Sequence, residues 1–210
     1  MKLLRKQVYK IIDECWANFI RQLSEGKIRI SKEASMQLEF SYILKLALSK
    51  VHKHTDETVW VDLERAVRVK NRSREIDVVI EITKGKRISL IPIEMKCYRS
   101  ISTSGGRRAA HDIFRHKVYE DIELLESYES LPNYTNGIQL TITDNKSMVF
   151  PKTKRGKSWT YDTAHGTRIK RGIKLNTPIG GKPVNLTLRK NYQFVWTTEN
   201  NFHFLMLRGK

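Results

Sequence analysis

Apolar side chains in the first fifty residues recur with the spacing of helices. In residues 3–23 they fall at intervals of three and four, which predicts an amphipathic helix. A second pattern of this kind predicts a helix over about 32–50, with Ser31 placed to cap its first turn. The apolar side of this second helix is expected to carry Met36, Phe40, Ile43, Leu44 and Ala47.

The pattern then changes to that of strands. A strand series begins at residues 59–63 and continues at about 75–82 and 88–97, where apolar and β-branched residues dominate. Residues 84–86, Lys-Gly-Lys, are typical of the tight turn of a hairpin between the last two strands.

The second half of the chain returns to a helix and then to strands. Residues 109–130 have helical periodicity, residues 137–143 alternate as a strand, and residues 192–197 and 202–207 predict a final hairpin. The order is that of an α/β protein in which the helix at 109–130 connects two strands of one sheet.

The segment 151–191 differs from the rest in composition. It holds eleven Lys and Arg residues and one acid, Asp162, with five glycines and the aromatic residues Trp159 and Tyr161 among the charges. One interpretation is a solvated excursion with ordinary lysine-rich edges. The other is an arm that lies on phosphates, because charge of one sign at this density is costly without a polyanion.

Whole-chain composition supports a globular nucleic-acid-binding protein. Of the 210 residues 40% are apolar, and 39 Lys and Arg against 22 Asp and Glu give a formal net charge of +17. Such an excess favours a polyanionic partner. The N-terminal residues are too charged for a signal peptide, no long apolar segment predicts a membrane span, and two distant cysteines give no disulfide framework. We therefore expect one cytoplasmic domain without a membrane partner.

Three charged residues interrupt the two most apolar strands. Asp77 lies in the first, and Glu94 and Lys96 lie two apart in the second, so the latter two share a face. Burying such groups is costly unless they pair or bind a metal. Two carboxylates beside an ammonium suit Mg²⁺ and a water about to be deprotonated, the requirements of phosphodiester hydrolysis. Burial near a metal is expected to lower the pKa of Lys96 enough for a direct role in proton transfer. The alternative is a simple Glu94–Lys96 salt bridge on a solvated face.

A third acid is a candidate for the same site. Glu39 lies on the second predicted helix, between the apolar residues Met36, Phe40 and Ile43. A carboxylate on a core-facing stripe is expected to have a function, here to reach the same metal directly or through a water. The alternative is a surface glutamate paired with a lysine such as Lys45.

Over about residues 30–145, the order of elements resembles that of the PD-(D/E)xK nuclease superfamily. A helix with Glu39 comes first, then a strand with Asp77, then a strand with Glu94 and Lys96, and finally a crossover helix. One residue departs from the family motif, since Ile76 replaces its proline. The resemblance implies that Asp77 and Glu94 are metal ligands, that Lys96 is the catalytic lysine and that Glu39 is the helical acid. The main-chain carbonyl of Met95 is expected to be a further ligand.

The resemblance implies an α/β, restriction-endonuclease-like three-layer core with a central mixed sheet. We expect one nuclease domain over 1–210, with its core at about 30–150 and 191–208 and the basic insertion at about 151–190. The expected function is that of a Mg²⁺-dependent endonuclease of the restriction or defence type, with Mn²⁺ able to substitute. It would act on DNA, with RNA an open alternative, as a homodimer. Expected nucleic-acid contacts are Arg99, Arg107, Arg108, Lys117, Lys152, Lys154, Arg155, Lys157, Arg168, Lys170, Arg171 and Lys174.

Three other functions stay open from the sequence. The chain could be a Holliday-junction or branched-DNA resolvase, or a nuclease subunit of a larger complex. It could also be a nucleic-acid-binding protein without catalysis, in which the acids and Lys96 form a buried ionic network. For the four arginines and lysines between 99 and 117, the alternative is a solvated loop.

Overall fold

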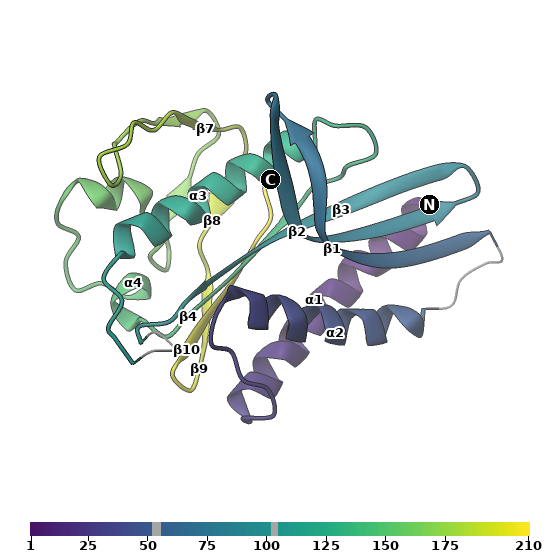
Figure 1. Cartoon of the computed structure of the whole chain (residues 1–210), viewed down its shortest axis with the longest axis horizontal. Coiled ribbons are helices and arrows are strands. Elements are labelled where there is room, and N and C mark those ends of the chain that lie inside the picture. Colours follow the sequence, from purple (N-terminus) through teal and green to yellow (C-terminus); the bar gives the residue numbers. More distant parts are fainter. Residues whose placement is uncertain (52–55, 102–104) are drawn as a thin grey trace.

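The fold is built on a six-stranded mixed β-sheet with helices on both faces. The computed structural model describes residues 1–51, 56–101 and 105–210. The sheet order is β1-β2-β3-β4-β10-β9, and two further pairs, β5–β8 and β6–β7, lie outside it. Only β3 and β4 of the large sheet pair in parallel, because the chain crosses between them through α3. Figure 1 shows the arrangement. The strands are β1 (Glu57–Val69), β2 (Arg72–Lys84), β3 (Arg87–Tyr98), β4 (Ile138–Thr143), β5 (Arg168–Ile169), β6 (Ile173–Leu175), β7 (Leu186–Leu188), β8 (Tyr192–Gln193), β9 (Trp196–Glu199) and β10 (Phe202–Leu207).

Two helices cover one face of the sheet. These are α1 (Lys2–Ser24) and α2 (Glu33–Ser49), and they share a core with Ile91, Ile93 and Met95 of β3. Helix α3 (His111–Tyr128) covers the other face, where Glu94 and Lys96 of β3 project. Helices on both faces are compatible with the expected three-layer core.

The long helices and the hairpin turn confirm the sequence prediction, with one change at a helix cap. Helix α2 begins after Lys32, and the Ser35 hydroxyl, not that of Ser31, accepts a hydrogen bond from the Lys32 backbone N–H at 3.1 Å. Gly85 takes a positive φ of 55° in the turn between β2 and β3.

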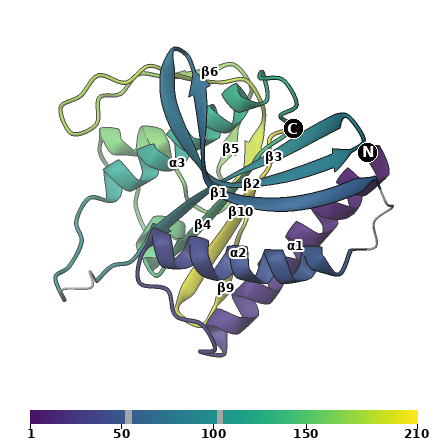
Figure 2. The same cartoon turned by 45° about the vertical axis from the view of Figure 1, so that its right-hand side comes forward.

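The β1–β2 hairpin is bent. Its ladder pairs Leu63 with Val78 and Arg65 with Ile76, but skips Glu64 and Asp77 between them. Glu64 has a φ of 51°, in the left-handed region, which turns the strand at this point. The outer half of the hairpin therefore rises away from the sheet, as Figures 1 and 2 show, and Val69 at its end packs with Leu125 of α3.

The basic segment is not a free-standing excursion, because its apolar residues pack against α3. A short helix, α4 (Lys146–Val149), lies just before it. The segment itself contains a short 3-10 helix, Lys157–Tyr161, and the strands β5 to β7, and β8 follows it directly. Tyr161 and Leu188 are fully buried in a cluster with Val118 and Ile122 of α3. The segment is thus a packed layer with its basic side chains on the outside.

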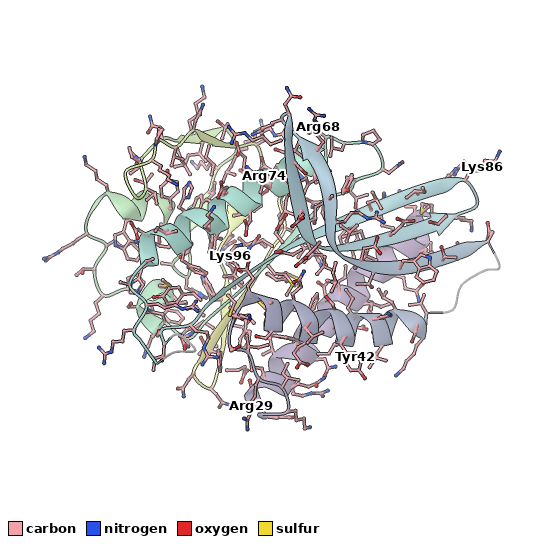
Figure 3. All side chains as sticks on the ribbon, in the orientation of Figure 1. Arg29, Tyr42, Arg68, Arg74, Lys86 and Lys96 are labelled. Atoms are coloured by element: carbon pink, nitrogen blue, oxygen red, sulfur yellow. The ribbon has the colours of Figure 1, made fainter. Side chains whose placement is uncertain are left out.

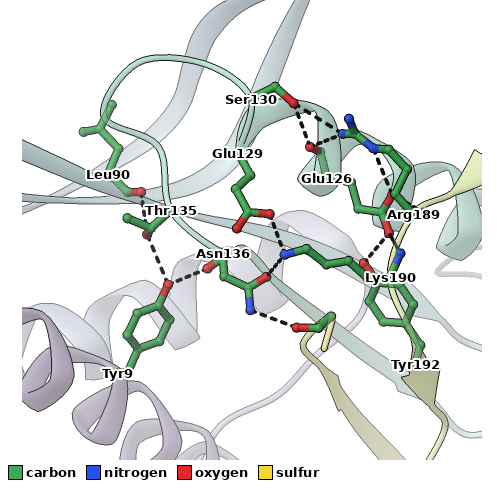
Figure 4. Close-up of polar contacts among 11 residues, drawn as sticks. Tyr9, Leu90, Glu126, Glu129, Ser130, Thr135, Asn136, Arg189, Lys190 and Tyr192 are labelled. Atoms are coloured by element: carbon green, nitrogen blue, oxygen red, sulfur yellow. Dashed lines mark hydrogen bonds and ion pairs between the residues drawn. The ribbon is translucent and has the colours of Figure 1, made fainter. Parts of the chain in front are cut away.

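Hydrogen bonds fix the end of this segment to α3, as Figure 4 shows. The buried carboxylate of Glu126 accepts from the backbone N–H groups of Arg189 and Lys190, at 2.7 and 3.0 Å, and from the Tyr192 hydroxyl at 2.9 Å. The Lys190 ammonium contacts Glu129 at 2.5 Å.

The predicted strand at 192–197 is wrong in one respect, because it divides in two. Residues Tyr192 and Gln193 pair with β5, whereas Trp196 to Glu199 pair with β10. Between them the Phe194 N–H donates to the Thr167 carbonyl at 2.9 Å, which ties this stretch to the basic segment.

Candidate active site

The structure brings Asp77, Glu94 and Lys96 together where two strands separate. The β2–β3 ladder ends at the pair Val78 and Ile93, so Asp77 is the first residue beyond it. The Asp77 carboxylate accepts a hydrogen bond from the Met95 N–H at 2.6 Å and interacts with the carboxyl group of Glu94. The strand pairing thus positions both carboxyl groups.

Lys96 is held by two acids from different helices. Its ammonium lies 3.2 Å from Glu33 of α2 and 3.3 Å from Asp121 of α3. The second oxygen of Glu33 accepts from the Cys97 N–H at 3.3 Å. The alternative of a solvated Glu94–Lys96 salt bridge does not describe this arrangement, because Glu94 is only 5% exposed and the ion pairs of Lys96 go elsewhere.

Neutral side chains support the two buried acids. The Tyr128 hydroxyl donates to Glu94 at 2.9 Å, and the Gln139 amide donates to Asp121 at 3.2 Å. On the other side of the site, the Gln37 amide donates to the Asp77 carbonyl at 2.6 Å. These bonds fix the orientation of the polar groups of the site.

The site has an excess of acid. Four carboxyl groups, Asp77, Glu94, Asp121 and Glu33, surround one ammonium, Lys96. Burial raises the pKa of Asp77, and burial with the nearby acids raises that of Glu94. Burial and neighbouring acids raise the pKa of Asp121 to about 7, against the pull of Lys96.

Without a metal ion, the pKa of Lys96 is not lowered. Burial lowers its pKa, but Asp121 and Glu33 more than offset that effect, so the pKa lies above the ordinary value. Lys96 is therefore a permanent cation in this arrangement.

Asp77, Glu94, Lys96 and Asp121 line an open cleft of about 570 Å³ between β2, β3 and α3. Arg74, from the outer half of the bent hairpin, and Lys117 of α3 also line it. Figure 3 shows Lys96 at the centre of the molecule, with Arg74 above it on β2. Two further acids, Glu75 and Glu120, line the cleft beside them, and Lys117 pairs with Glu120 at 2.6 Å, so the lining is mixed in charge.

Glu39 does not join this site. In the described parts of the chain, no hydrogen bond or ion pair connects it with Asp77, Glu94 or Lys96. The α2 residues that do reach the site are Glu33 and Gln37, which lie one turn apart on one face. Glu39 lies two residues after Gln37, about 200° around the helix. It is half-buried beside the α2 core.

The predicted nucleic-acid contacts fall into four groups. Arg99 is used by the fold, since it donates to Asp144 at 2.8 Å and to the Ile30 carbonyl. Arg107 and Arg108 lie close to the active-site strand β3, in a loop whose residues 102–104 are outside the described residues. Lys117 is exposed in the cleft itself. The remaining eight are exposed on the packed basic segment: Lys152, Lys154, Arg155, Lys157, Arg168, Lys170, Arg171 and Lys174.

Whether Mg²⁺ fits depends on a small set of ligands. Within residues 1–51, 56–101 and 105–210, no group of three or more His, Cys, Asp or Glu side chains is arranged to bind a metal ion. Mg²⁺, however, is commonly held by one or two carboxylates with the rest of its shell made of water. The adjacent carboxyl groups of Asp77 and Glu94 in an open cleft fit that requirement.

Comparison with known proteins identifies no relative. No protein-family model, no curated protein and no solved structure matches the chain. Among the described helices, none has both the length and the apolar character needed to span a bilayer.

Proposed function

We propose that the chain is a Mg²⁺-dependent nuclease that hydrolyses phosphodiester bonds in DNA, with the restriction-endonuclease-like arrangement. One observation carries the proposal. At the point where β2 leaves β3, a pair of adjacent carboxyl groups lies beside a lysine that is held between two other acids, and this group opens to a cleft. We further propose that it acts as a homodimer of the restriction or defence type, because one site per chain suits the cutting of two strands.

The side chains divide the work by charge. Asp77 and Glu94 would hold Mg²⁺, which when bound supplies charge neutralisation and a water of lowered pKa. Lys96, held protonated by Glu33 and Asp121, would stabilise the negative charge that develops on the phosphate. Lys117 and Arg74 would position the phosphate at the cleft wall.

The competing function is a nucleic-acid-binding protein without catalysis. It is favoured by the fact that both ion pairs of Lys96 are already made within the chain. Against it, a purely structural network would not leave the acids in excess of the ammonium beside an open cleft.

The test is cleavage of single-stranded, duplex and branched DNA with Mg²⁺ by the wild type, by Lys96→Ala and by a control, Lys86→Ala. Lys86 lies at the distant end of the β2–β3 hairpin (Figure 3), so its loss should leave the rate unchanged. Lys96→Ala should lower the rate by about 100-fold or more, as expected for removal of a charge that stabilises the transition state. If no substrate is cut, or if Lys96→Ala cuts like the wild type, the proposal is wrong. Preference for branched substrates would indicate a resolvase.

A further inference from the structure

A second cleft, of about 770 Å³, lies at the other end of α3. It is formed by the first turns of α3, by α4 and by the start of the basic segment, and α4 lies beside the N-terminal end of α3 in Figure 1. Arg115 of this cleft precedes Asp121 of the active site by six residues, or about 9 Å along the helix at 1.5 Å per residue. The two clefts therefore lie on α3 within about two turns of each other, with Arg115 and Asp121 about 240° apart around the helix.

Two aromatic rings line the second cleft, and each contacts neighbouring side chains. The guanidinium carbon of Arg115, a residue only 5% exposed, lies 4.1 Å from the centre of the Trp159 ring. The ring of Phe150 lies 5.4 Å from that of His165 and 5.7 Å from that of His203, yet Phe150 is 43% exposed. The Lys154 ammonium also lies over the Trp159 ring, 5.8 Å from its centre. Partly exposed aromatic rings with cations beside them are suited to stacking with a flat ligand.

Cations accompany the rings. Lys146 and Lys152 line the cleft, and within the described residues neither forms an ion pair. Asp112 is the acid among the lining residues. Flat apolar rings with lysines beside them match a nucleobase and its phosphate, the combination by which proteins bind single-stranded nucleic acid. A duplex does not offer such a contact, because its bases are stacked on one another.

We propose that this aromatic cleft (Phe150, Trp159, Lys146 and Lys152) binds an unpaired nucleotide of the nucleic acid, with the base on the rings and the phosphate on the lysines. The proposal rests on the proposed function only in taking nucleic acid as the ligand. It specifies the substrate class, since it favours substrates with a single-stranded segment next to the cleavage point.

The test measures binding without cleavage. Fluorescence anisotropy with a labelled oligo-dT, in the Lys96→Ala background and without Mg²⁺, gives the dissociation constant. Phe150→Ala and Trp159→Ala should each weaken binding by about tenfold, the usual effect of removing one stacked ring. Trp60→Ala is the matched control, because Trp60 is 63% exposed on the edge strand β1. Phe150→Trp keeps a flat ring and should bind like the background protein, so a loss with Phe150→Ala alone would not be a folding defect.

Three further arms identify the ligand. The two aromatic variants should bind a duplex of the same length almost as tightly as the background protein does. Binding of a matched oligo-U shows whether RNA is also a ligand. Mononucleotide dTMP, at equal nucleotide concentration, should compete poorly with the oligonucleotide. Unchanged oligo-dT binding in both aromatic variants, an equal loss in Trp60→Ala, or competition by dTMP as strong as that by the oligonucleotide would overturn the inference. If the aromatic variants lose binding while the wild type cuts nothing, the proposed function fails and this inference stands. If cleavage depends on Lys96 but the aromatic variants bind normally, only this inference fails.

Discussion

At the residue scale, the acid of α2 that contacts Lys96 is Glu33 and not Glu39. Glu33 holds both the Lys96 ammonium and the Cys97 N–H, whereas Glu39 lies on another side of α2. We expect Glu33→Gln to lower the cleavage rate by about 10- to 100-fold, the usual effect of losing a partner that orients a catalytic group. Glu39→Gln, a matched change on the same helix, should leave the rate unchanged. Steady-state cleavage assays compare the two, and a larger effect of Glu39→Gln would restore the original assignment.

Part of this site could be predicted from residue patterns. Asp77, Glu94 and Lys96 stand out because charges inside apolar strands are rare. Asp121 is also an acid on an apolar helical stripe, that of α3 with Val118, Ile122 and Leu125. The argument that made Glu39 a candidate, a carboxylate among core-facing residues, applies equally to Asp121. Glu33 gives no such signal, because an acid in the first turn of a helix is ordinary. Its role depends on where the start of α2 lies relative to β3, which is a tertiary fact.

The excess of carboxyl groups predicts that the protein is stabilised by Mg²⁺. Bringing Asp77 and Glu94 together without a cation costs free energy that an ion would recover. We expect Mg²⁺ to raise the melting temperature of the wild type. At a hundredfold excess of Mg²⁺ over its dissociation constant, the free energy of unfolding should rise by about 2.7 kcal/mol. Asp77→Asn should reduce that shift and be at least as stable as the wild type in EDTA. An equal shift in both proteins, measured by calorimetry, would place the ion elsewhere.

The raised pKa of Asp121 predicts how stability depends on pH in EDTA. The folded protein holds the proton up to about pH 7, whereas the unfolded chain releases it near pH 4. Between these values the folded state binds more protons, so this group's stabilising contribution is full below pH 4 and is lost as the pH rises through about 7. The free energy of unfolding, measured with denaturant and plotted against pH, should therefore have different slopes for the wild type and Asp121→Asn over this window. Above the window the two plots should run parallel. Parallel curves throughout would contradict the assignment.

At the scale of elements, the long helices and the central hairpin were predictable because their periodicities are unbroken over many residues. The bend of the β1–β2 hairpin was not. It depends on Glu64 taking a left-handed conformation, which Glu has no intrinsic tendency to adopt. The bend matters for the proposed function, because Arg74 of the outer half lines the candidate active-site cleft. The division of the strand at 192–197 was likewise hidden, since a backbone bond to Thr167 decides it.

The attachment of the basic segment to α3 should depend on Glu126. Its carboxylate satisfies two backbone N–H groups and a tyrosine hydroxyl, and replacing it with alanine leaves these donors buried without a partner. We expect Glu126→Ala to lower the free energy of unfolding by about 3 kcal/mol or more. Glu129→Ala removes a more exposed partner of Lys190 and should cost under about 1 kcal/mol. Urea unfolding measures both, and equal losses would show that the Glu126 network is not the attachment.

At the scale of the whole molecule, positive charge is concentrated in one layer. The segment 151–191 carries eleven of the 39 Lys and Arg residues and one of the 22 acids, and it packs beside α3, the helix that lines both clefts. Its eight predicted contact residues are all exposed. Apolar residues such as Leu188 attach the layer, and within the described residues most of its eight predicted contact residues form no ion pair, Lys154 with Asp162 being the exception.

This distribution predicts which charges set the salt dependence of DNA binding. Each phosphate neutralised on duplex DNA contributes about 0.9 to the slope of log affinity against log salt. Two fourfold alanine variants divide the layer, and a third fourfold variant on α1 and α2, which cover the opposite face, is the control. The first set is Lys152, Lys154, Arg155 and Lys157, the second is Arg168, Lys170, Arg171 and Lys174, and the control set is Lys2, Lys6, Lys45 and Lys50.

Each variant of the layer should weaken binding at low salt and flatten the slope, because fewer counterions are released when fewer phosphates are contacted. The control should do neither beyond the small effect of its change in net charge, since its lysines lie across the sheet from both clefts. Anisotropy titrations of duplex DNA between about 50 and 200 mM salt measure the slopes over a range in which phosphate contacts change affinity strongly. If the control flattens the slope as much as either set, net charge alone attracts the DNA and the basic layer has no special part in binding it.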